Sequence, residues 1–227
     1  MNNKDYEAWE ERLEEDKHEE GAAQSEEKER WQTTVLLYLH DFVYLLGAIL
    51  LVMLLCFRVI TVSGTSMNKT LLDGDSLLLL TNAFYNDPQY GDIVVASTKN
   101  FDDGKPIIKR VIATEGQWVD IDFEKGIVRI SDDGMETWRE LDEPYVNTPT
   151  NLQEGMQFPL YVEENCVFVM GDNRNGSHDS RSPDIGLLDE RELLGKVLLL
   201  VFPGTNGTDV NGQPNEERDF GRIGAVD

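Results

Sequence analysis

The sequence predicts a mainly β protein, in which a single N-terminal transmembrane helix precedes a β-rich domain. The first observation behind this prediction is one long apolar segment, residues 35–57, which is uncharged from residue 43 onward. The second is the pattern after this segment, where short runs rich in Val, Ile and Leu are bounded by Gly, Asp, Asn or Pro. Few amphipathic helical patterns lie between these runs, which favours an all-β body.

The chain is strongly acidic. Its 227 residues carry a formal net charge of −23, with 43 Asp and Glu against 20 Lys and Arg. A protein with this balance cannot neutralise phosphate groups, so we expect no nucleic-acid partner. The two cysteines, Cys56 and Cys166, lie in the apolar segment and in the soluble part, so we expect no disulfide between them.

Residues 1–34 are dominated by Glu, Lys and Arg and contain few apolar side chains. Such a composition cannot offset the entropy lost on folding, so we interpret the segment as an acidic, disordered tail. A helical arm is the alternative, since Glu and Lys favour helices and several of their pairs lie four residues apart.

Residues 35–57 are long enough to cross a bilayer as one helix, with Asp41 near one end, where it reaches the headgroups. The alternative is a cleaved secretory signal, which needs a basic start and a small-residue cleavage site. Because an acidic tail precedes this segment and Arg58 follows it, we interpret it as a retained anchor. Lys and Arg are nearly balanced on its two sides, so charge counting leaves its orientation open.

Residues 58–202 form the predicted β-rich domain, with a polar excursion at about 131–160. Residues 203–227 are rich in Gly, Asn and Asp and are expected to be a flexible end. The predicted strands are Ser76–Leu80, Asp92–Ser97, Ile107–Ala113, Trp118–Phe123, Ile127–Ser131, Tyr161–Glu163, Cys166–Met170 and Gly195–Phe202.

The first candidate catalytic group is Ser66, which lies nine residues past the end of the apolar segment. Nine residues span at most about 30 Å, so Ser66 is expected near a bilayer surface. A serine among small residues becomes a nucleophile when a base takes its proton. Serines in such loops are more often turn residues, so this segment alone does not establish catalysis.

The second candidate is Lys109, in the predicted strand Ile107–Ala113. Side chains alternate along a strand, so Lys109 shares a face with Ile107 and Val111 while Arg110 points the other way. Apolar surroundings lower the pKa of a lysine and can leave a free amine, which is the base that a serine needs. The alternative is a lysine at a strand edge that keeps its amine in water.

The third candidate region is a polar loop, residues 170–183, directly after a strand of the buried type. Small hydroxyl side chains alternate there with Asp and Arg, which suits a rigid hydrogen-bonded shelf beside a reacting centre. An ordinary surface turn is the alternative. The loop lacks the register of oxygen ligands of a calcium loop, so we expect no metal site.

In this order behind one anchor, the three regions resemble the bacterial type I signal peptidases, membrane-bound serine proteases with a Ser/Lys dyad. The resemblance runs from about Val62 to the end of the chain, where Arg222-Ile223-Gly224 is similar to the usual ending of the family. The four motifs that carry it are GTSMNKTL at 64–71, GDIVVA at 91–96, KRVIATEG at 109–116 and GDNRNGSHDSRSPDIG at 171–186.

The resemblance implies that Ser66 is the nucleophile, that its backbone N–H helps to hold the oxyanion, and that Lys109 is the neutral base. It also implies supporting roles for further residues: Ser177 hydrogen-bonded to the lysine amine, Asp179 with Arg181 bracing the loop, and Asp172 paired with Arg110. The implied fold is a β-rich catalytic domain with apolar surface on the bilayer. No metal and no cofactor are implied.

The resemblance further implies signal-peptide-bearing preproteins as substrates, cut after small residues of the Ala-x-Ala type. It implies a single-pass protein of the cell membrane, anchored in the lipid bilayer, with its N-terminus in the cytoplasm and its catalytic domain on the outer face.

Two residues depart from the pattern of the family. Lys69 stands where proline is usual, and it creates a Ser66-x-x-Lys69 spacing. Gly64 stands where some members have a serine that donates to the oxyanion, so the second donor is unassigned. A Ser-x-x-Lys acyltransferase is one alternative, although its companion motifs are missing from the sequence. A non-catalytic, membrane-anchored β-domain that binds a partner is the other.

Overall fold

The structure is a computed structural model, and it divides the chain into two compact units, Met1–Met53 and Leu54–Asp227. Each unit is described by itself. The described residues are 30–31, 33–99, 101–146, 148–205 and 218–226. Most of the expected acidic tail, residues 1–29, lies outside them.

The N-terminal helix runs from Thr33 to Cys56, and it is long and apolar enough to cross a membrane. It is the only helix of that kind in the described part of the chain, and its apolar side chains are exposed. The sequence placed the last residue of this element at Phe57, which instead opens the first strand. An exposed apolar helix of this length is what a bilayer requires.

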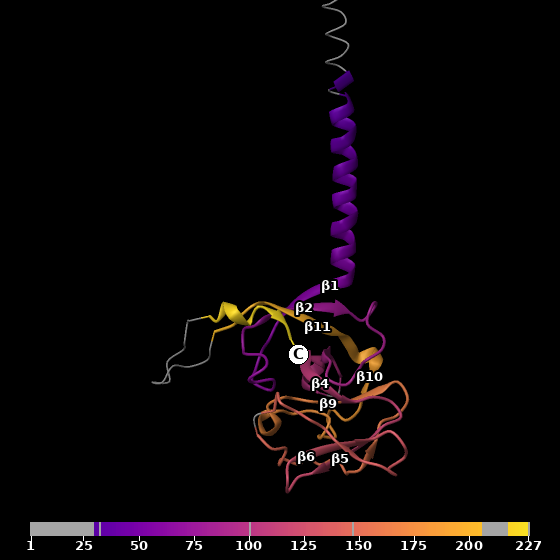
Figure 1. The fold of residues 1–227 in the computed structure, drawn as a ribbon, viewed down its shortest axis with the longest axis vertical. Helices are drawn as coiled ribbons and strands as arrows, with labels where there is room; N and C mark the ends of the chain where they lie inside the picture. The colour runs from indigo at the N-terminus through magenta and orange to yellow at the C-terminus, as the bar shows by residue number, and fades with distance from the viewer. Residues whose placement is uncertain (1–29, 32, 100, 147, 206–217, 227) are drawn as a thin grey trace, which may run out of the picture. The chain divides into compact units, whose positions relative to one another are not determined.

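A large antiparallel sheet forms the body of the second unit (Figure 1). Its strands follow the order β1-β2-β11-β3-β4-β9-β10, and β12 pairs with β11 outside this path. The bounds are β1 Phe57–Thr61, β2 Ser76–Thr81, β3 Ile93–Ala96, β4 Ile107–Ala113, β9 Cys166–Met170, β10 Leu188–Asp189, β11 Leu193–Phe202 and β12 Gly224–Ala225.

A second, four-stranded antiparallel sheet follows the order β7-β6-β5-β8. In Figure 1, β5 and β6 lie at the opposite end of this unit from β1 and β2. The polar excursion that the sequence placed at 131–160 supplies the edge strand β7 and leads into β8. The bounds are β5 Trp118–Asp122, β6 Ile127–Ser131, β7 Arg139–Glu140 and β8 Leu160–Tyr161.

Most predicted strands are confirmed with small shifts at their ends, while β1, β7, β10 and β12 were not predicted. Three of these four are only two residues long and therefore show no alternation of apolar and polar side chains. The fourth, β1, follows the apolar helix directly, so its own pattern merges with that of the helix. The strand expected at Tyr161–Glu163 is found at Leu160–Tyr161.

Three clusters of buried apolar side chains make up the core. The first lies on β2, β3 and β11. It also contains Met67, which directly follows Ser66, and Leu71, one turn further along the chain. The second joins β4 and β9 of the large sheet to β5 and β6 of the small one. The third covers further side chains of β3, β4 and β9 together with Leu188 and Leu193. Both candidate catalytic residues thus adjoin the core, since Ser66 precedes Met67 and Lys109 lies on β4.

Within the described residues there are four short 3-10 helices: η1 Asp102–Gly104, η2 Arg174–Gly176, η3 Glu190–Glu192 and η4 Phe220–Arg222. The last of these belongs to the segment that the sequence assigned to a flexible end. Residues 218–226 of that segment are docked, because η4 leads into β12 and β12 pairs with β11. Residues 206–217 lie outside the described part.

Candidate active site

The segment that carries Ser66 is fixed by its apolar neighbours. Met67 and Leu71 are buried in the first core cluster, and the Leu71 N–H donates to the Met67 carbonyl at 2.9 Å. Ser66 itself is half-buried. Burial of Met67 and Leu71 holds the turn against the sheet and leaves the serine hydroxyl at its surface.

Lys109 reaches Ser66 from β4. It lies opposite Val94 of β3, and only 4% of its surface is exposed. Its amine nitrogen Nζ lies 2.9 Å from Ser66 Oγ and donates to the Ile108 carbonyl at 3.2 Å. The two candidate catalytic residues, 43 positions apart, are therefore in direct hydrogen-bond contact.

Burial lowers the pKa of Lys109 from 10.5 to about 8, because removal from water penalises the charged ammonium. The negative charges of Asp179 and Glu154 raise the pKa but do not cancel the effect of burial. At pH 7, one unit below this pKa, about a tenth of the amine is neutral. That fraction can accept the proton of the serine hydroxyl.

The predicted pair of Asp172 and Arg110 is present and wholly buried. Arg110 donates from Nε to Asp172 Oδ1 at 2.9 Å and from Nη2 to Oδ2 at 2.8 Å. The Thr70 hydroxyl donates to the same Asp172 Oδ2 at 2.5 Å. Asp172 thus joins the strand that carries Lys109 to the segment that carries Ser66.

The predicted brace of Asp179 and Arg181 is also present. Arg181 Nε donates to Asp179 Oδ1 at 2.8 Å, and its Nη2 donates to Asp179 Oδ2 at 2.9 Å. The Gly171 N–H donates to the same carboxylate at 3.0 Å, and Arg181 Nη2 also donates to the Arg174 carbonyl at 2.6 Å. The buried pair of Asp179 and Arg181 therefore ties together several parts of the loop after β9.

Ser177 is the exception among the predicted site residues. Its hydroxyl is buried and has no hydrogen-bond partner in the described part of the chain, so the expected bond to the Lys109 amine is not made. The side chain packs instead against Gly171, where an added Cβ would lie 2.2 Å from Ser177 Oγ and 2.5 Å from the Ser66 carbonyl oxygen.

Asn173 supplies a connection that the sequence did not reveal. Its N–H donates to the Ser66 carbonyl and its side-chain amide donates to the Thr65 carbonyl, each at 3.0 Å. Asn173 belongs to the loop motif recognised in the sequence, but nothing in the pattern indicated its partners. Through these bonds the loop holds the backbone on both sides of the Ser66 Cα, at the Thr65 and Ser66 carbonyls.

A cavity of about 310 Å³ opens beside Ser66 and Lys109. Its remaining walls are mostly apolar and come from the end of β1 with the residues after it and from the start of β4. The lining residues are Ile60, Thr61, Val62, Ser63, Ser66, Met67, Lys105, Pro106, Ile107, Ile108 and Lys109.

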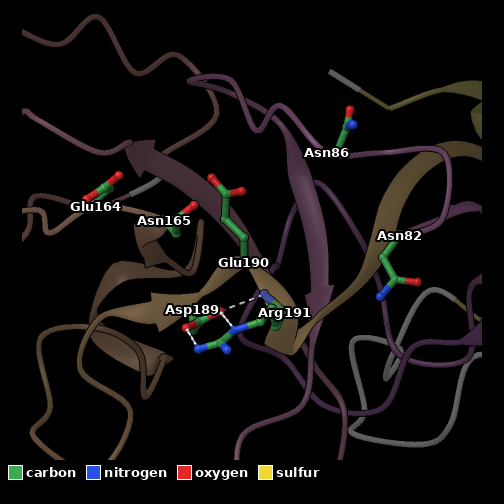
Figure 2. Close-up of a pocket in the computed structure, with 7 residues that line it drawn as sticks. All are labelled: Asn82, Asn86, Glu164, Asn165, Asp189, Glu190 and Arg191. Atoms are coloured by element: carbon green, nitrogen blue, oxygen red, sulfur yellow. Dashed lines mark hydrogen bonds and ion pairs between the residues drawn. The ribbon is translucent and has the colours of Figure 1, made fainter.

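Figure 2 shows a second, larger cavity of about 590 Å³ with polar walls. It contains none of the predicted site residues, and its Arg191 is paired with Asp189 in the wall itself. Its lining residues are Asn82, Asn86, Glu164, Asn165, Asp189, Glu190 and Arg191. Size alone therefore does not mark the candidate active site.

The two residues that depart from the expected motif take no part in the Ser66–Lys109 contact. Lys69 is exposed. The Gly64 N–H donates to Asp73 Oδ1 at 2.7 Å.

Within the described residues, no group of three or more His, Cys, Asp and Glu side chains is placed to hold a metal ion.

Residues 35–202 match the family model described as "Signal peptidase, peptidase S26". The chain belongs to this signal peptidase family. A similar protein, named "Probable signal peptidase I-1", comes from Synechocystis sp. and is 33% identical over 71% of this chain and 81% of its own length. The signal peptidase I of Bacillus licheniformis is 31% identical over 68% of this chain and 81% of its own length.

A solved signal peptidase I from Enterococcus faecalis V583 has a TM-score of 0.37 and 26% identity, with 48% of this chain and 96% of that chain covered. Membership of the signal peptidase family rests on the family model and the sequence relatives. The matched range contains all but the first two residues of the apolar helix, together with Ser66, Lys109 and the loop after β9. It ends at Phe202, before the docked C-terminal segment.

Proposed function

We propose that Ser66 and Lys109 are the catalytic dyad with which this serine endopeptidase removes signal peptides from exported preproteins. The observation that carries the proposal is the 2.9 Å contact between Ser66 Oγ and an amine that is buried and has a lowered pKa. A nucleophile in contact with a base that is partly neutral near physiological pH is what serine acylation requires.

The reaction has two stages. Ser66 Oγ attacks the carbonyl carbon of the scissile bond while its proton passes to Lys109 Nζ, and Nζ then gives that proton to the leaving amine. A water molecule next loses a proton to Nζ and attacks the acyl-enzyme ester. The bond from the acyl carbon to Ser66 Oγ breaks, Nζ returns the proton to Oγ, and the signal peptide leaves. The Ser66 backbone N–H is the proposed donor to the oxyanion in both stages.

Substrate selection follows from the shape of the cavity beside the dyad. An extended peptide along a strand edge points alternate side chains into the enzyme, so the residue before the cut and the residue two before it enter pockets on the same face. Ile60, Val62 and Ile108 give the cavity beside the dyad apolar walls, and the resemblance to the type I signal peptidases implies small side chains at both positions. We therefore propose cleavage after small residues, in Ala-x-Ala patterns that follow an apolar stretch.

A preprotein series with Ala, Val, Leu or Phe at these two positions tests the selection. We expect the rate to fall at each added size step, at a cost of about 1–3 kcal/mol for a methylene or two that does not fit. Equal cleavage of the Ala and Phe substrates would contradict the proposed pockets.

The proposed location is the outer face of the cell membrane, with the Thr33–Cys56 helix in the lipid bilayer and the N-terminus in the cytoplasm. A nucleophile ten residues beyond the end of the helix suits a substrate held in the same bilayer by its own apolar segment. Protease added to wall-stripped cells is expected to degrade the catalytic domain and spare the N-terminal tail. Loss of the tail alone would reverse the proposed orientation.

The central experiment compares preprotein cleavage by the wild type, Ser66→Ala, Lys109→Met and Lys69→Ala. We expect Ser66→Ala and Lys109→Met each to abolish processing. A variant that carries both substitutions is expected to show the same residual rate, because a nucleophile and its base act as a unit. Lys69→Ala is the matched control and is expected to remain active, since Lys69 is exposed. Activity in Lys109→Met together with loss in Lys69→Ala would favour the Ser-x-x-Lys acyltransferase chemistry instead.

A further inference from the structure

A buried carboxylate outside the dyad is saturated with donors. Asp75 is fully buried. Its Oδ2 accepts from the Leu72 N–H at 2.7 Å, and its Oδ1 accepts from the Gly204 N–H at 2.6 Å. Arg222 completes the set with Nη1 to Oδ1 at 3.0 Å and Nη2 to Oδ2 at 2.7 Å. A buried charge needs such compensation, and among the described residues the side chain that supplies it is Arg222, from the C-terminal segment.

The same guanidinium also reaches the nucleophile segment directly. Arg222 Nη2 donates to the Thr70 carbonyl at 3.2 Å. Asp75 and Arg222 therefore hold the backbone at two points, the Thr70 carbonyl and the Leu72 N–H, within six residues of Ser66. Neither contact is part of the strand pairing of the sheet, so the C-terminal segment adds a constraint that the core does not provide.

Thr70 is constrained from a second direction. Its hydroxyl donates to Asp172, which is paired with Arg110, the neighbour of Lys109 on β4. Arg222 on one side and Asp172 on the other thus fix the Thr70 residue at its carbonyl and at its hydroxyl. Because the second link leads to the strand of the base, the position of Thr70 relates the Ser66 segment to Lys109.

We propose that Arg222 is a positioning residue for Ser66, and that residues 219–226 act as a C-terminal latch on the nucleophile segment. The latch is anchored by η4 and by the pairing of β12 with β11, and it lies beyond the range that matches the family model. The predicted effect of the latch on turnover rests on the proposed function of the dyad. The predicted effect on how well ordered the backbone of residues 66–72 is does not depend on that function.

Lysine at position 222 separates positioning from charge compensation. It keeps a positive charge beside Asp75, so the carboxylate is not left unpaired, but an ammonium lacks the planar fork that binds two carboxylate oxygens and a carbonyl together. We expect Arg222→Lys to fold, to keep its KM, and to lose about 10- to 100-fold in kcat through misplacement of the nucleophile. The purely structural alternative predicts a wild-type kcat for every folded molecule.

The experiment measures amide hydrogen exchange and preprotein cleavage on the full chain for the wild type, Arg222→Lys and Arg218→Lys. Arg218 is the matched control because it lies in the same segment but donates to the Pro203 carbonyl and stacks on Phe202, away from residues 66–72. We expect faster exchange of the Leu71 and Leu72 amides in Arg222→Lys alone, with the sheet amides unchanged. Arg222→Gln is a second variant, expected to show a larger change.

Wild-type exchange of residues 66–72 and a wild-type kcat in Arg222→Lys would overturn the latch. So would exchange that accelerates equally over the whole domain, because that outcome indicates general destabilisation. If Arg222→Gln does not fold, Arg222→Lys decides alone. If amide exchange of residues 66–72 is faster in Arg222→Lys but the wild type cleaves no preprotein, the latch is supported and the proposed function is refuted.

Discussion

Lys109 and Arg110 are neighbours on β4 and are both buried cations, yet their surroundings differ completely. Arg110 is paired with Asp172, donates to the Gly91 carbonyl and lies 3.9 Å from the centre of the Tyr145 ring. Lys109 forms no ion pair within the described part of the chain, and its amine contacts the Ser66 hydroxyl and a backbone carbonyl.

The difference teaches how one strand can hold a structural charge and the proposed chemical base side by side. Alternation along the strand sends the two side chains to opposite faces. On one face a bidentate carboxylate compensates the Arg110 guanidinium, and this pair joins two segments. On the other, burial without a carboxylate partner lowers the pKa of Lys109 and frees its amine to take a proton.

The sharpest way to break the comparison is Lys109→Arg, which gives both positions the same side chain. A guanidinium cannot give up its proton in this pH range, so we expect preprotein cleavage to fall at least about 10³-fold. Single-turnover cleavage measures the loss, and circular dichroism checks the fold. Activity within tenfold of the wild type would mean that Lys109 is not the base.

Asp172→Asn removes the compensation from Arg110 instead. Breaking a buried ion pair leaves an unpaired charge, and we expect a loss of about 3–5 kcal/mol in the free energy of unfolding. Chemical denaturation measures it. Asp189→Asn is the matched control, because its partner Arg191 is exposed, and it is expected to change stability little. Equal losses in the two variants would show that burial of the Arg110 pair is unimportant.

Lys109→Met sharpens the comparison through stability rather than activity. The folded pKa of about 8 lies below the unfolded value of 10.5, so the unfolded chain binds more protons between these pH values and wild-type stability rises there with pH. Below pH 8 the folded wild type bears the full free-energy cost of burying the charged ammonium. We therefore expect the free energy of unfolding of Lys109→Met to be higher by about 3 kcal/mol, since one pKa unit corresponds to about 1.4 kcal/mol. The advantage is expected to shrink towards pH 10.5. Denaturation at pH 7 and pH 10 measures it, and a difference independent of pH would contradict it.

The same pKa predicts the pH dependence of the rate. We expect kcat/KM to rise about tenfold between pH 7 and pH 9, as the buried amine loses its proton, and then to level off. Asp189→Asn, which leaves the site untouched, is expected to give the same profile. A flat profile between pH 6 and pH 10 would exclude Lys109 as the group that titrates.

The smallest effect is expected for Lys69→Ala. This lysine follows Ser66 closely in the sequence but is exposed, in contrast to the buried Lys109. We expect no measurable change in cleavage rate or in its pH dependence. A loss comparable to that of Lys109→Arg would transfer the role of base to the nearer lysine.

Sequence reasoning reached the mainly β fold and the Ser66–Lys109 contact, because alternation and motif resemblance are local properties of the chain. It could not supply the two-residue strands, which have no pattern of their own. It also predicted a hydrogen bond from the Ser177 hydroxyl to the Lys109 amine. In the structure this hydroxyl has no partner among the described residues, and the side chain packs against Gly171. Side-chain direction within a loop depends on backbone angles that a motif does not encode.

The C-terminal segment illustrates the same limit over a longer range. Its many Gly, Asn and Asp residues predicted a flexible end, but Arg222 forms an ion pair with a carboxylate 147 residues earlier. Nothing local to either residue indicates the other. Such pairs become predictable only when the register of the sheet is known, because the pairing of β12 with β11 fixes where the segment runs.

Gly171 gives this domain an unusual pattern of mutational tolerance. Any Cβ at this position would overlap Ser177 and the Ser66 carbonyl oxygen, so the position excludes every other amino acid on grounds of volume. Gly116 differs, because its φ of +82° favours glycine while no atom lies within 4 Å of an added Cβ. In a saturation library we therefore expect Asn, which tolerates this backbone region, to survive at position 116 and no substitution to survive at position 171.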